Sequence, residues 1–185
     1  MKTLFASICA AALFAQPASA TLITFNANFS GSQQATANPS FGTGAATLVA
    51  DTVGQTLKVS ESFTNLSAGS VAGHLHVGKF GMSGPVIIPF TNFPVGVTSG
   101  SYTGTFTAAN LINQTTSGVA TFAELLTALT SNNAYLNIHS SLYPAGEIRG
   151  QVAATSVPEP MTLIVLGSGL AAMALARRRL ALSRV

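Results

Sequence analysis

The histidines are the residues of this chain whose type and spacing could carry chemistry, and there are three of them. His74 and His76 lie one residue apart in GHLHVGKFG, residues 73–81, so in a β-strand both side chains point to the same face. His139 ends a second predicted strand, residues 134–139. Two imidazoles from one strand and a third from another can form a three-nitrogen site for Cu or Zn. The spacing therefore predicts a candidate copper or zinc site.

The second strand belongs to a predicted hairpin, AYLNIHSSLYPAGEIRGQV, residues 134–152. His139 and Glu147 flank its loop, so we expect them to be near neighbours, with Glu147 as a fourth ligand or as a residue that orients a ligand. Arg149 lies two residues after Glu147, on the same predicted strand face, where the two side chains could pair. The residues that we expect around the ligands are Tyr135, Asn137 and Arg149.

A structural interpretation of the same histidines stands beside the metal site, and it is the one that we favour at this stage. Each imidazole would donate a hydrogen bond to a carboxylate, an asparagine or a backbone carbonyl, and the cluster would stiffen the sheet. Both interpretations remain open on the sequence alone.

The elements that must position these side chains are short strands. Residues 55–66, QTLKVSESFTNL, place Leu57, Val59 and Phe63 at even spacing, which is typical of a half-buried strand. Other predicted strands are residues 21–29, 45–50, 74–77, 86–90, 102–107, 134–139 and 147–152. One helix is predicted at Thr121, which forms a capping box with Glu124. The pattern predicts an all-β fold, an antiparallel β-sandwich with one short helix.

The first twenty residues have the three parts of a signal peptide. Lys2 gives a positive start, residues 4–15 are apolar, and Ala18 and Ala20 fit the cleavage rule. We therefore expect a signal helix over residues 1–20, cleavage by signal peptidase, and a mature chain that begins at Thr21. The single cysteine, Cys9, would leave with the signal, so the mature protein would have no disulfide.

The other end reads as a tether and a membrane anchor. Residues 153–160 form a linker, residues 161–176 an apolar transmembrane helix, and residues 177–185 a basic tail that the positive-inside rule keeps in the cytoplasm. The motif residues are Val157, Pro158, Glu159, Pro160, Arg177, Arg178 and Arg179. Together they resemble a PEP-CTERM sorting signal, and this resemblance implies an exosortase-like membrane protease that removes the tail. A plain single-pass anchor is the alternative.

The domain between the two ends has little charge. Its basic residues are Lys58, Lys79 and Arg149, against the acids Asp51, Glu61, Glu124 and Glu147. The net charge of +3 therefore comes from the two ends, and no basic patch suggests a nucleic-acid partner.

Several motifs of residues 22–152 resemble the CHRD domain, named from chordin. They are Gly42-Thr43-Gly44, His74-Leu75-His76, Ser83-Gly84-Pro85-Val86, Asn137-Ile138-His139 and Pro144-Ala145-Gly146-Glu147-Ile148-Arg149-Gly150. Asn38-Pro39-Ser40 departs from the Pro-Pro pair of the family's first loop. The resemblance implies an immunoglobulin-like domain with a binding role and brings no settled activity.

The His-x-His spacing is also similar to the copper strand of Cu/Zn superoxide dismutase. The chain has no further histidines for a bridged zinc site, which argues against that activity. The leading expectation is a non-enzymatic, exported protein that starts as an inner-membrane precursor and reaches the cell envelope or the extracellular matrix. The PEP-CTERM resemblance implies exopolysaccharide or a surface protein as its partner. The alternative is a Cu- or Zn-binding domain with a superoxide-dismutase-like site built from the three histidines.

Overall fold

The computed structural model describes residues 21–155. The predicted signal peptide, the sorting motif, the apolar helix and the basic tail lie outside the described residues. Within residues 21–155, no helix is long and apolar enough to cross a membrane.

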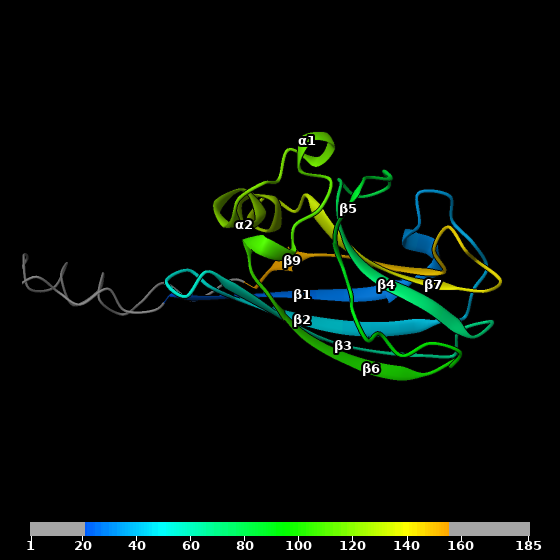
Figure 1. The fold of residues 1–185 in the computed structure, drawn as a ribbon. Helices are drawn as coiled ribbons and strands as arrows, with labels where there is room; N and C mark the ends of the chain where they lie inside the picture. Colours follow the sequence, from blue (N-terminus) through cyan, green and yellow to red (C-terminus); the bar gives the residue numbers. More distant parts are fainter. Residues whose placement is uncertain (1–20, 156–185) are drawn as a thin grey trace, which may run out of the picture. The chain divides into compact units, whose positions relative to one another are not determined.

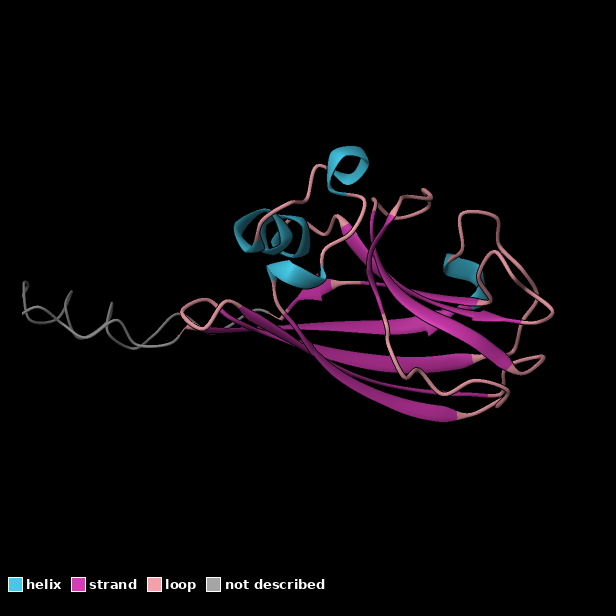
Figure 2. Ribbon diagram, in the orientation of Figure 1, coloured by secondary structure: helices cyan, strands magenta, loops and turns pink. Residues whose placement is uncertain are grey.

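Nine antiparallel strands dominate the domain (Figures 1 and 2). They are β1 (Leu22–Ser30), β2 (Thr43–Asp51), β3 (Thr56–Thr64), β4 (Ser70–Val77), β5 (Val86–Pro89), β6 (Gly100–Phe106), β7 (Ala134–Ser140), β8 (Ile148–Gln151) and β9 (Ala153–Ala154). Eight of them follow the order β5-β4-β7-β8-β1-β2-β3-β6, and β9 pairs with β1. The antiparallel all-β class is therefore confirmed, and β9 extends the paired strands into the predicted linker.

The strands form because apolar and polar residues alternate along them. In β3, Leu57, Val59 and Phe63 are buried while Lys58 and Ser62 are exposed. The β2–β3 turn is held by Asp51, whose carboxylate accepts from the backbone N–H groups of Val53 and Gly54. This hairpin supplies the centre of the sheet.

The sheet curls so that its two ends share one core. Phe90, just after β5, stacks on Tyr102 and Phe106 of β6, with ring centroids 4.8 and 5.5 Å apart. Phe93 stacks on Phe63 of β3 at 5.7 Å. Strands β5 and β6 stand at opposite ends of the strand order, so these contacts bring the two ends face to face across the core.

The predicted helix is α2 (Phe122–Thr130), and its start is confirmed. The Thr121 hydroxyl accepts from the backbone N–H of Glu124, and the Glu124 carboxylate accepts from the backbone N–H of Thr121. Its buried face packs into the shared core. Three shorter helical turns were not predicted from the sequence: η1 (Gly31–Gln33), η2 (Ala108–Asn110) and α1 (Gln114–Ser117).

Candidate metal centre

The pairing of β4 with β7 brings the three histidines together. His74 lies opposite Asn137, His76 opposite Tyr135, and His139 opposite Ala72. Because side chains alternate along a strand, the apolar neighbours Leu75, Leu136 and Ile138 point to the other face, into the core. The sheet therefore presents a polar face on β4 and β7 that is backed by an apolar one.

The three imidazoles form a compact group. One ring nitrogen of each of His74, His76 and His139 lies within 4.8 Å of the others. His74 Nδ1 and His139 Nε2 are 3.1 Å apart, in hydrogen-bond contact. The predicted convergence of the three histidines is thus what the fold produces.

Backbone carbonyls orient two of the rings. His76 Nδ1 lies 2.9 Å from the carbonyl oxygen of Gly84, and His139 Nδ1 lies 3.0 Å from that of Pro144. A carbonyl can only accept, so in each neutral ring Nδ1 carries the hydrogen and Nε2 carries the electron pair; in His139 that pair accepts from His74 Nδ1. This is the arrangement that fixes the tautomer of a metal-ligating histidine.

All three imidazoles are held in the neutral form. Burial lowers the pKa of His74 to about 4, with His139 adding to the effect. Burial likewise lowers the pKa of His76 to about 4, against the opposing hydrogen bond to Gly84, and burial lowers the pKa of His139. Neutral imidazole is the protonation state that binds a metal.

His76 Nε2 is buried and has no hydrogen-bond partner in the described part of the chain. A buried polar atom without a partner costs about 1–3 kcal/mol. His76 is also one of the three histidines whose ring nitrogens converge. A bound cation would satisfy it.

Tyr135 holds His76 in two ways. Its ring stacks on the imidazole with centroids 4.7 Å apart. Its hydroxyl accepts from the Gly84 N–H at 3.0 Å and donates to the Gly84 carbonyl at 3.3 Å. Tyr135 thereby fixes both the imidazole and the carbonyl that orients it.

Arg149 covers the other side of this pair. Its guanidinium carbon lies 3.6 Å from the centre of the Tyr135 ring. The same group donates to the carbonyls of Met82 at 2.7 Å and Lys79 at 2.8 Å, and to Gln151 at 2.7 Å. Arg149 is 1% exposed, so it fastens the 78–85 loop against the sheet from inside the protein.

Glu147 is not brought to the histidines. Its carboxylate accepts from the Ser40 hydroxyl at 2.6 Å and from the Ser67 backbone N–H at 2.5 Å, and it is not part of the nitrogen cluster. Gly146, at φ +124°, breaks the strand alternation just before it. The expected pairing with Arg149 also fails, because the guanidinium binds carbonyl oxygens instead.

The loop between β1 and β2 closes over the polar face. Asn137, the predicted neighbour of the ligands, accepts from Gln34 at 2.7 Å through its side-chain oxygen. The backbone N–H of Gln151 donates to the Gln33 side chain at 3.1 Å. Sequence reasoning missed Gln34 and the orienting carbonyls of Gly84 and Pro144; the Gly-Pro and Pro-x-Gly turns beside the histidine strands were the available signal.

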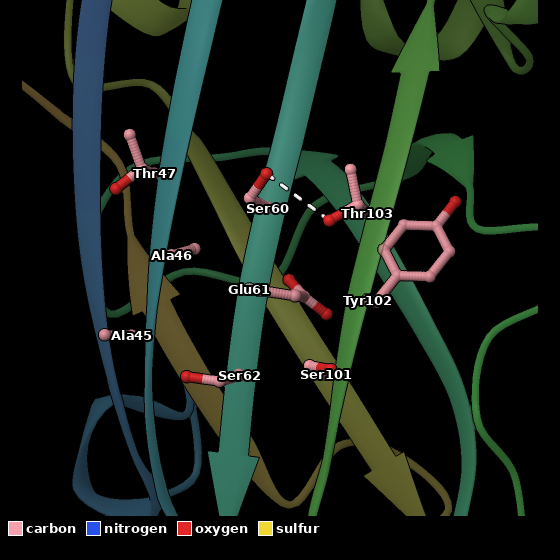
Figure 3. A pocket seen from close by; sticks show the side chains of 9 residues that line it. All are labelled: Ala45, Ala46, Thr47, Ser60, Glu61, Ser62, Ser101, Tyr102 and Thr103. Atoms are coloured by element: carbon pink, nitrogen blue, oxygen red, sulfur yellow. Dashed lines mark hydrogen bonds between the residues drawn. The ribbon is translucent and has the colours of Figure 1, made fainter.

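A separate hollow lies over β2, β3 and β6, and no histidine lines it (Figure 3). Its outer lining is made of small hydroxyl side chains, and Ser60 and Thr103 are in contact at 3.4 Å. Glu61 also lines the hollow. It is 4% exposed and lies in register with Ala46 and Tyr102, and both its carboxylate oxygens lack a partner within the described residues. Burial raises its pKa to about 8, so Glu61 is a neutral acid in the core-facing row of β3 at pH 7.

Comparison with known families matches residues 25–152 to the CHRD domain. Neither the curated proteins nor the solved structures gave a match. The matched segment contains the three histidines, Tyr135 and Arg149. CHRD domains are typically extracellular, which fits the predicted export.

Proposed function

This chain belongs to the CHRD domain family, and we propose that it is an exported binding protein whose domain holds Cu or Zn through His74, His76 and His139. The observation that carries the proposal is the convergence of three ring nitrogens within 4.8 Å. His76 and His139 each have Nδ1 committed to a backbone carbonyl. The set matches three-histidine sites that leave a further coordination position open.

The alternative, a purely structural cluster, explains less of the geometry. Such a cluster would give each imidazole nitrogen a partner, and the His74–His139 contact does so. It leaves His76 Nε2 buried and unpaired, with no compensation in the described structure. A metal ion would bind this nitrogen together with those of His74 and His139.

When bound, the metal supplies an electron-pair acceptor and, if it is copper, a one-electron redox centre. The protein keeps the imidazoles neutral and holds their rings in a fixed orientation. Gly84 and Pro144 fix the tautomers, while Tyr135 and Arg149 hold the loop that carries Gly84. These roles describe a binding domain, and we propose no substrate turnover.

Metal analysis of the purified full-length chain tests the site. After incubation with Cu or Zn and removal of free metal, we expect about one ion per chain. His76→Ala should abolish stoichiometric binding. Thr105→Ala, on the remote strand β6, is the matched control and should keep it. Equal metal content in the wild type and His76→Ala would reject the site.

We also propose that the termini direct the protein to the cell surface. The signal-like residues 1–20 and the tail with Pro158, Glu159 and Pro160 support export, followed by removal of the tail by an exosortase-like protease. An immunoglobulin-like binding domain that meets exopolysaccharide or a surface protein fits this route. Cell fractionation with terminal sequencing is the test: we expect Thr21 as the new N-terminus, and an uncut cytoplasmic chain would contradict it.

A further inference from the structure

We propose that the histidine site prefers monovalent copper, Cu(I), over Cu(II) and Zn(II). This inference rests on the proposed metal site and adds the charge of the ion that the site selects. It is carried by two features: a ligand group without negative charge, and a buried guanidinium behind one of the ligands.

The ligand group is uncharged. It consists of three imidazoles, and within residues 21–155 no carboxylate joins it. Glu147, the carboxylate that the sequence predicted as a ligand, is not part of the group, and its Oε1 accepts from Ser40 and Ser67. The ligands therefore compensate none of the positive charge on a bound metal. Burying a divalent cation among them costs more free energy than burying a monovalent one.

A positive charge already stands next to the group. Arg149 lies against one face of the Tyr135 ring, and Tyr135 stacks on His76. The guanidinium is buried, and it donates to two backbone carbonyls and one side-chain amide, none of them anionic. Its field disfavours further positive charge at His76, and the repulsion grows with the charge of the metal.

Coordination number points the same way. Zn(II) in proteins is almost always four-coordinate, so with three histidines it needs a fourth ligand from outside the group. Cu(I) has a filled d shell and accepts three donors in a plane. The closely spaced nitrogens of His74, His76 and His139 supply that number without help. Cu(I) thus needs neither an added ligand nor a compensating anion.

The test is a set of competition titrations on the purified full-length chain. Cu(I) is measured without oxygen, with ascorbate as reductant, against bicinchoninate; Zn(II) and Cu(II) are measured against chromophoric chelators. We expect Cu(I) to bind at least ~100-fold more tightly than Zn(II), a free-energy gap of about 2.7 kcal/mol at ~1.36 kcal/mol per tenfold. Equal or tighter binding of Zn(II) or Cu(II) overturns the preference and leaves the metal site standing. No stoichiometric binding of any of the three ions overturns the site itself.

A substitution that changes the charge but hardly the size of a side chain tests whether electrostatics causes the preference for Cu(I). Asn137 is the cross-strand neighbour of His74, and its side-chain oxygen accepts from Gln34. Asn137→Asp keeps that acceptor and adds one negative charge beside the site. We expect the ratio of the Cu(I) affinity to the Zn(II) affinity to fall about tenfold. We also expect bound Cu(II) to persist longer before it is reduced, which its electron paramagnetic resonance signal would show. Asn92→Asp, exposed in the loop after β5, should change neither. A ratio that is unchanged in a folded Asn137→Asp protein contradicts the electrostatic argument.

Discussion

His76 and Tyr135 face each other across β4 and β7 as a stacked pair, with ring centroids 4.7 Å apart. The Tyr135 hydroxyl also binds both backbone groups of Gly84, whose carbonyl orients His76 Nδ1. The imidazole is therefore fixed by a ring beneath it and by a carbonyl that the same tyrosine holds in place.

Tyr135→Phe separates these two functions, because phenylalanine keeps the stack and loses both hydrogen bonds to Gly84. We expect metal affinity to fall ~10-fold, as is usual when the groups behind a ligand are removed. Competitive titration gives the affinity, and the thermal midpoint shows whether the fold is retained. An affinity equal to that of the wild type would show that the stack alone positions His76.

Gly84→Ala tests the position of the same carbonyl by displacing the backbone that carries it. A Cβ at this position would overlap the carbonyl of Val77 at the end of β4, so the 78–85 loop must move. We expect a loss of about 1–3 kcal/mol of unfolding free energy together with weaker metal binding. Gly81→Ala is the control for a glycine in the same loop with open space around it, although its φ of +75° gives it a smaller cost of its own. Denaturant titration would contradict the prediction if Gly84→Ala cost no more than Gly81→Ala.

The metal affinity should resist acid. Protons compete with a metal only as the pH falls through the pKa of the folded ligands, and burial lowers that pKa to about 4 for His74 and His76. Between pH 7.5 and 5.5 we expect less than a ~10-fold loss of affinity, whereas three ordinary histidines would lose about a thousandfold. Titrations at the two pH values decide it, and a thousandfold loss would show that the rings titrate normally.

The buried Glu61 predicts that the stability of the fold decreases as the pH rises. Its folded pKa of about 8 lies above the ordinary value of 4.5, so the folded state holds a proton that the unfolded state releases. Stability should therefore be fully present below about pH 4.5 and fall as the pH rises from there to about 8, by at most ~1.4 kcal/mol per unit. Glu61→Gln should remove this fall relative to the wild type in urea titrations from pH 5 to 8. A parallel pH profile for the two proteins would contradict the buried neutral acid.

The sequence predicted the parts of the site that follow from regular alternation. His74, His76 and His139 share a face because β4 and β7 are regular and adjacent. Alternation also places position 61 in the buried row of Leu57, Val59 and Phe63, so the burial of Glu61 could have been foreseen.

The remaining contacts depend on loops, where alternation does not hold. Glu147 follows Gly146, whose φ of +124° lies outside regular strand geometry, and its carboxylate accepts from Ser40 and Ser67. The carbonyls of Gly84 and Pro144, and the side chain of Gln34, reach the site from turns and from a loop distant in sequence. The long-range pairing that closes the curled sheet sets these positions, and no local pattern encodes it.

The most direct test of the central claim is X-ray absorption spectroscopy at the metal edge of the copper-loaded full-length protein. We expect three imidazole nitrogens at ~2.0 Å, with the outer-shell scattering of histidine rings, and loss of this pattern in His76→Ala. A metal that shows no imidazole scattering, or the same spectrum in His76→Ala as in the wild type, would contradict it.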